Sequence, residues 1–154
     1  MSLTFEILDT PARPALSIRT HAPVGELPQL FGRSYSAITQ YLGELGEAPA
    51  GEPYAAYYNL DMQDLDLEIG FPVGRELPGR GPIQPSQLPG GKLATCLFVG
   101  PYADMAPAYE ALKSWIAEQG YEPTGVAYEV YLNDPNQSPP QEPQTRILLP
   151  LKAG

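Results

Sequence analysis

A nine-residue pattern occurs twice in this chain, as GEPYAAYYN at residues 51–59 and as GVAYEVYLN at residues 125–133. The glycine, two tyrosines and the asparagine of the two copies align at a constant offset of 74 residues. A further glycine pair, Gly46 and Gly120, keeps the same offset. A shared pattern of this length indicates an internal duplication.

Each copy also contains the same order of predicted elements. In the first copy, residues 14–20 predict a strand, and apolar residues spaced by three and four over residues 27–45 predict an amphipathic helix. In the second copy, residues 92–99 predict the strand and residues 105–116 carry the helical stripe. The nine-residue pattern and a closing strand follow each helix, so each copy is a β-α-β-β unit.

These units predict an α+β fold, built as one domain over residues 1–154. Repeat one covers about residues 4–74 and repeat two about residues 92–152, joined by a Pro- and Gly-rich linker at residues 75–91. We expect tandem β-α-β-β repeats to form one antiparallel sheet, with two helices on one face and a ligand cleft on the other.

Composition and charge exclude several classes of function. The chain has 9 Lys and Arg against 18 Asp and Glu, a net charge of −9, and its cations are spread evenly, so we expect no direct nucleic-acid binding. One cysteine, Cys96, and one histidine, His21, provide neither a disulfide nor a Cys or His metal cluster. We therefore expect no metal and no cofactor. Without a signal-like or membrane-spanning segment, we expect a cytoplasmic protein.

Strand alternation predicts which side chains line the open face of the sheet. Over residues 128–132, the more apolar alternate positions should lie under the helix, which leaves Glu129 and Tyr131 on the opposite face. The same argument places Tyr57 and Glu68 of repeat one on that face. The open face is thus predicted to carry tyrosines and carboxylates.

Several motifs in this order carry a resemblance to a known family: GGKLA at residues 90–94, GPY at 100–102, WI at 115–116, YEVYL at 128–132, LPL at 149–151 and EIGFPV at 68–73. The chain resembles the gyrase-inhibitor-like (GyrI-like) small-molecule-binding domain, over nearly its whole length. The same domain serves as the effector-binding half of bacterial multidrug-responsive activators. The resemblance implies an aromatic cleft between the repeats, with a glutamate that meets lipophilic cations and corresponds to Glu129.

Glu129 is the strongest candidate ligand-binding residue. A partly desolvated carboxylate favours a ligand cation, and Tyr131 and Tyr57 would add cation–π attraction of about 0.5–2 kcal/mol each. Tyr102 would cover one end of the cleft and Phe98 would line its floor. The alternatives are ordinary ones: a solvated strand carboxylate for Glu129, packing for Tyr57, Tyr131 and Phe98, and a staple at the start of the helix for Tyr102.

Glu68 shares the predicted open face but belongs to a dense acidic run that also contains Asp61, Asp64 and Asp66. A run of like charges is more often a solvated surface than a binding site. Glu68 is therefore predicted either as a ligand contact or as part of a solvated acidic surface.

The sequence favours a stand-alone protein that binds small hydrophobic, often cationic molecules, for multidrug binding or sequestration, because the two repeats use the whole chain and leave no DNA-binding segment. Two alternatives stay open. The same cleft could hydrolyse strained cyclopropane-type toxins, with Glu129 as the base and Tyr131 as the acid. Alternatively, the acidic run at residues 61–68 could bind a protein partner such as a topoisomerase and inhibit it.

Overall fold

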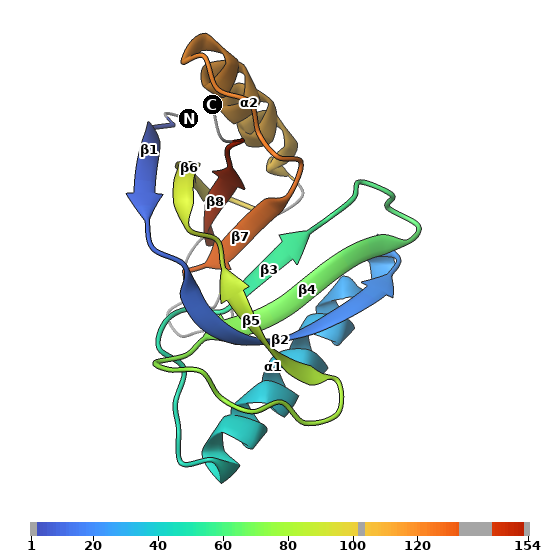
Figure 1. The fold of residues 1–154 in the computed structure, drawn as a ribbon. Helices are drawn as coiled ribbons and strands as arrows, with labels where there is room; N and C mark the ends of the chain where they lie inside the picture. Colours follow the sequence, from blue (N-terminus) through green and yellow to red (C-terminus); the bar gives the residue numbers. More distant parts are fainter. Residues whose placement is uncertain (1–2, 102–103, 133–142, 153–154) are drawn as a thin grey trace. The chain divides into compact units, whose positions relative to one another are not determined.

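The computed structural model describes residues 3–101, 104–132 and 143–152 of the chain. These residues form two compact units, whose ribbons are drawn in Figure 1. Unit 1 contains the described residues up to Pro11 together with those from Gly90 onward, and unit 2 contains Ala12–Pro89.

Unit 2 contains one helix and four antiparallel strands in the order β3-β4-β2-β5. A short 3-10 turn, η1, precedes the helix. Its elements are β2 (Arg13–Ala22), η1 (Val24–Glu26), α1 (Leu27–Glu44), β3 (Tyr54–Tyr57), β4 (Leu65–Pro72) and β5 (Ile83–Leu88).

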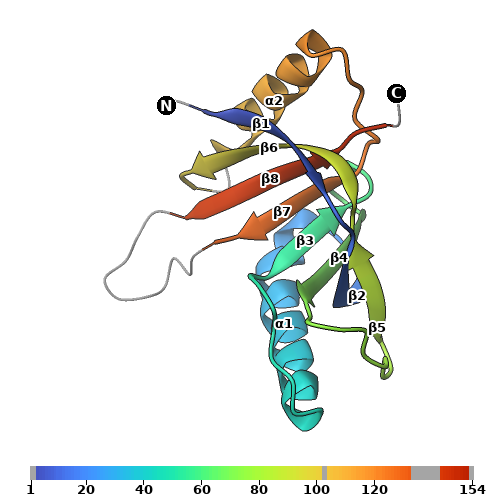
Figure 2. The same cartoon turned by 60° about the vertical axis from the view of Figure 1, so that its left-hand side comes forward.

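Unit 1 likewise has a helix, α2, and four antiparallel strands, which are in the order β1-β6-β8-β7. Figure 2 shows these four strands side by side. The elements are β1 (Phe5–Thr10), β6 (Gly91–Val99), α2 (Ala106–Glu118), β7 (Ala127–Tyr131) and β8 (Gln144–Pro150). The predicted α+β class, with antiparallel strands and two helices, is confirmed.

Both helices stop where the repeated glycines stand. Gly46, just beyond α1, has φ +71°, and Gly120, just beyond α2, has φ +84°. This left-handed conformation suits glycine because it has no Cβ, and it turns the chain out of the helix.

Two edge strands differ from the sequence prediction. The stretch expected to be a linker contains β5, which pairs with β2, and the N-terminal strand β1 pairs with β6 of the second repeat. Both strands lie at the edge of their unit's strand order, where polar residues and proline are tolerated. Because β5 contains Pro85 and several polar residues, its sequence does not show the apolar alternation by which a strand is predicted.

Each helix packs on one face of the strands in its own unit and thereby defines a helix-facing side. In unit 1, Leu112 and Ile116 of α2 share a buried core with Cys96 of β6 and Ile147 of β8. In unit 2, α1 packs on the face of β2 and β4 that carries Leu16 and Ile69, among others. Among the described residues, no helix is long and apolar enough to cross a membrane.

Candidate functional site

Glu129 faces the helix of unit 1, which corrects the predicted orientation of its strand. Its direct partner across the β7–β8 pair is Ile147, a core residue under α2, and directly paired residues of antiparallel strands share a face. Glu129 and Tyr131 therefore lie on the helix-facing side. Tyr128 and Val130, which were expected under the helix, lie on the other side.

Three predicted site residues come together on this side. Tyr131 pairs with Thr145 of β8, which in turn pairs with Phe98 of β6, so these three side chains form one row across the sheet. Glu129 lies in the adjacent row. We call these four residues and Tyr109 of α2 the Glu129 site.

The Glu129 carboxylate is held by two phenol groups. Tyr109 of α2 donates a hydrogen bond to Oε2 over 2.5 Å, and Tyr131 donates to Oε1 over 2.9 Å. Burial raises the pKa of Glu129 above its ordinary value, although the two hydrogen bonds act in the opposite direction. Among the described residues, no lysine, arginine or histidine forms an ion pair with it.

Two apolar positions near Glu129 belong to the packed core. Phe98 is only 1% exposed and lies in the cluster formed with α2. Cys96, in the row of Glu129, has its pKa raised to about 11 by burial. Its thiol is therefore protonated at neutral pH and is a poor nucleophile.

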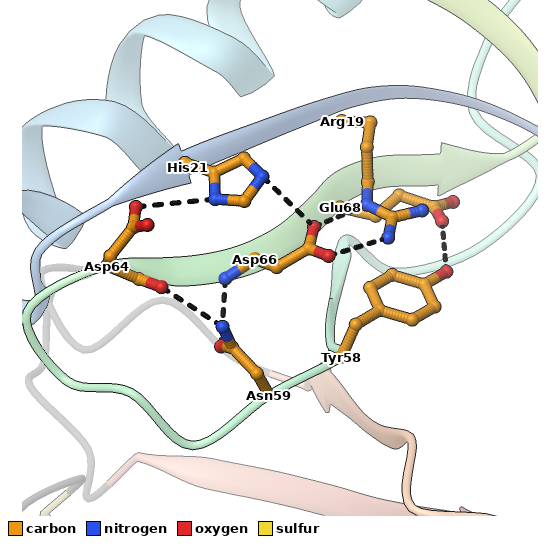
Figure 3. Close-up of polar contacts among 7 residues, drawn as sticks. All are labelled: Arg19, His21, Tyr58, Asn59, Asp64, Asp66 and Glu68. Carbon is orange, nitrogen blue, oxygen red and sulfur yellow. Dashed lines mark hydrogen bonds and ion pairs between the residues drawn. The ribbon is translucent and has the colours of Figure 1, made fainter.

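Glu68 lies on the face of unit 2 opposite α1, as predicted, and belongs to a hydrogen-bonded cluster of that unit. It is 6% exposed and accepts hydrogen bonds from Tyr54 over 2.6 Å and from Tyr58 over 2.7 Å. The Arg19 guanidinium lies over the Tyr58 ring (Figure 3), 3.7 Å from the ring centre. We call Glu68, Tyr54, Tyr58 and Arg19 the Glu68 network.

The acidic run near Glu68 has partners within the chain. Asp66 accepts two hydrogen bonds from Arg19, over 2.7 and 2.9 Å, and His21 lies 3.3 Å from Asp64 (Figure 3). The hydrogen bond from Arg19 lowers the pKa of Asp66 and raises that of Arg19 itself. The charge of Glu68 also raises the pKa of Arg19, more weakly than Asp66 does, so Glu68 has a cation in its surroundings.

The two other predicted aromatic residues are Tyr57 and Tyr102. Tyr57 belongs to unit 2 and packs on the helix-facing side, near Leu30 and Phe31, rather than on the opposite face as expected. Tyr102 lies outside the described residues. The register explains the error for Tyr57: it pairs with Leu67, which faces α1.

The duplication provides an internal comparison for the Glu129 site. At the 74-residue offset, Tyr109 corresponds to Tyr35, and Glu129 to Ala55. Tyr35 donates its hydrogen bond to the backbone carbonyl of Tyr54 over 2.8 Å. Both repeats thus carry the helical tyrosine, and repeat two alone adds a carboxylate for it. The helical spacing predicts Tyr109 only as a packing residue. Its alignment with Tyr35 at the 74-residue offset is the sequence signal that could have identified it as a site residue.

The described residues contain no group of three or more His, Cys, Asp or Glu side chains placed to hold a metal ion. Hydrogen-bond donors and aromatic rings around one carboxylate can instead bind an organic ligand.

A family model described as the GyrI-like small molecule binding domain matches residues 3–152. The chain belongs to this family. The GyrI-like assignment agrees with the duplicated β-α-β-β units, and it makes the domain a small-molecule-binding one. A search of the curated proteins found no match.

Solved structures share the GyrI-like fold at low sequence identity. The chain matches EcmrR in a DNA complex with 20% identity and a TM-score of 0.83, over 99% of this chain and 58% of EcmrR. A hydrolase from Listeria innocua matches with 15% identity and a TM-score of 0.69, over 96% of this chain and 91% of the hydrolase. SAV2435 bound to tetraphenylphosphonium matches with 11% identity and a TM-score of 0.61, over 99% of this chain and 95% of SAV2435. The chain therefore spans little more than half of EcmrR.

Proposed function

We propose that this GyrI-like domain binds hydrophobic organic cations at the Glu129 site. The observation that carries the proposal is a carboxylate whose described partners are two tyrosine hydroxyls and no cation. Glu129 is half-buried, so its carboxylate loses part of its hydration with no counter-ion to replace it, and a ligand cation would offset that loss. Glu68 differs because a cation, Arg19, lies within its electrostatic influence, although the hydrogen bonds of Arg19 go to Asp66.

Aromatic surface around Glu129 suits the apolar part of such a ligand. The rings of Tyr109 and Tyr131 adjoin the carboxylate, whereas Phe98, in the next row, is packed in the core. A cation over a tyrosine face gains about 0.5–2 kcal/mol. One charge and several rings select weakly by shape, which supports binding of a range of compounds for sequestration. Tyr57, Glu68 and Tyr102 stay predictions as ligand contacts.

A thermal-shift comparison tests the proposal with tetraphenylphosphonium and the neutral triphenylphosphine oxide. Binding to the folded state adds about 2.7 kcal/mol of stability at a ligand concentration of 100 Kd. We expect the cation to raise the melting temperature in a saturable way and the neutral compound to have a much smaller effect. Equal stabilisation by both compounds would show that the negative charge of the site has no role.

Hydrolysis of a strained electrophile is the second candidate, and the raised pKa of Glu129 is the observation that favours it. A carboxylate with a pKa nearer neutrality is a better general base. Glu129 would take a proton from water as the water oxygen bonds to a ring carbon. The Tyr131 hydroxyl would donate a proton to the carbon released by cleavage of the ring bond. The internal partners of the acidic run give no comparable support to topoisomerase binding.

A further inference from the structure

The Glu129 site contains a hydroxyl group without a hydrogen-bond partner. Thr145 of β8 is fully buried, and among the described residues nothing donates to or accepts from its Oγ1. Burying an unpaired hydroxyl is destabilising, and folded proteins pair nearly all such groups. The orphan hydroxyl therefore needs an explanation that packing does not supply.

The position of Thr145 suggests what could pair with it. Thr145 lies directly opposite Tyr131 in the β7–β8 pair and diagonally from Glu129 on the same face. Directly opposed Cβ atoms lie about 4.5–5.5 Å apart, and diagonal neighbours about 7–8 Å. One ligand nitrogen between the two side chains can therefore reach both the Thr145 hydroxyl and the Glu129 carboxylate.

The first repeat has neither polar group. The closing strands of the two repeats align at an offset of 78 residues, as Ile69 and Pro72 do with Ile147 and Pro150, and this places Leu67 at the position of Thr145. The 74-residue offset places Ala55 at that of Glu129, and both Leu67 and Ala55 are fully buried. The helical tyrosine and the strand tyrosine are present in both repeats. The hydroxyl and the carboxylate thus occur together, in repeat two only, which links them to one role.

Glu129 retains hydrogen-bonding capacity beyond its tyrosine partners. Each carboxylate oxygen can accept about two hydrogen bonds, and each accepts one from the part of the chain that the structure describes. A threonine hydroxyl likewise offers two acceptor positions and one donor. The Glu129 carboxylate and the Thr145 hydroxyl can therefore accept hydrogen bonds from two N–H groups of the same ligand nitrogen.

The geometry points to protonated primary and secondary amines as the ligand class of this site, donating N–H groups to both Glu129 and Thr145. This inference rests on the proposed function and narrows it. A quaternary ammonium or a phosphonium satisfies the charge but has no N–H, so it leaves Thr145 unpaired. Because Thr145 is covered, a ligand reaches it only when a covering side chain rotates, and Tyr131 stands directly opposite.

Two probes of the same ring content and charge test the inference by titration calorimetry at pH 7: dibenzylamine, which is protonated there, and dibenzyldimethylammonium. We expect the wild type to bind dibenzylamine more tightly. In Thr145→Val, which removes the hydroxyl at constant shape, we expect the affinity for dibenzylamine to fall about tenfold or more. The affinity for dibenzyldimethylammonium should change by less than about twofold.

Thr95→Val is the matched control. Thr95 of β6 carries the other buried hydroxyl without a partner among the described residues, and its register neighbours place it on the face away from α2. Both valine variants remove an orphan hydroxyl, so both should melt at a slightly higher temperature than the wild type. Thr95→Val should leave the affinities for both probes unchanged.

The outcomes separate this inference from the function on which it rests. If Thr145→Val weakens both probes equally, or neither, the hydroxyl does not select amines and the inference is overturned. Should dibenzyldimethylammonium bind in a Glu129-dependent way in that case, the proposed function survives alone. If neither probe binds the wild type, the cation site and the amine preference both fail.

Discussion

Replacing Glu129 with Gln lowers the affinity for tetraphenylphosphonium by at least about 30-fold, because a charge pair removed from a desolvated site costs about 2–5 kcal/mol. The glutamine keeps the length of the side chain and one oxygen that can accept from Tyr109 or Tyr131. The expected loss therefore reports mainly on charge. Titration calorimetry of both proteins at pH 7 measures it.

Glu110→Gln is the control for that experiment. Glu110 is an exposed residue of α2, next to Tyr109 in sequence, and its replacement changes the net charge by the same amount. If the field of the whole acidic chain attracts the cation, the two variants will lose affinity alike. If the charge of Glu129 itself holds the cation, Glu110→Gln changes the affinity for tetraphenylphosphonium by less than about twofold.

Replacing Gly70 with Ala destabilises the protein by about 3 kcal/mol or more. A Cβ at Gly70 of β4 would lie 2.5 Å from the backbone oxygen of Leu16 and 2.7 Å from Cβ of Ser17. Neither atom is the end of a flexible side chain, so the strands must move apart, and overpacking of this kind costs several kcal/mol in the worst cases. Urea denaturation of the variant measures the loss.

Gly32→Ala shows that the effect comes from position and not from the residue types exchanged. Gly32 is an exposed residue inside α1, and a Cβ built there meets no atom within 4 Å. Alanine favours a helix over glycine by about 1 kcal/mol, so this variant should be more stable than the wild type. A Gly70→Ala protein as stable as the wild type would show that β2 and β4 pack less closely than described.

The duplication and the helical stripes were sufficient to predict the fold class, but not every strand. Apolar spacing identifies α1 and α2 because each buries one stripe against its own strands. The edge strands β1 and β5 gave no clear signal, since residues such as Pro85 are tolerated where one side of a strand needs no partner. Pairing of β1 with β6 is non-local and has no signature in periodicity.

The faces of the site strands could not be predicted from alternation. Tyr54, Ala55 and Ala56 of β3 are all fully buried, so both faces of this strand are covered and alternation carries no contrast. A shift of one residue moves every side chain to the other face. The predicted alternation was out of phase by one residue, so it placed Glu129 and Tyr57 on the wrong face. The prediction that Glu129 and Tyr131 share a face does not depend on that phase and is correct.

Carbon-13 NMR titration of the Glu129 side-chain carboxyl, with and without saturating tetraphenylphosphonium, tests the central claim most directly. Burial places its pKa above the ordinary value in the free protein, and a cation held at the carboxylate favours the charged form. We therefore expect the ligand to lower the pKa of Glu129, and its affinity to rise as the pH increases through the free protein's value. A bound cation that leaves this pKa unchanged would contradict binding at Glu129.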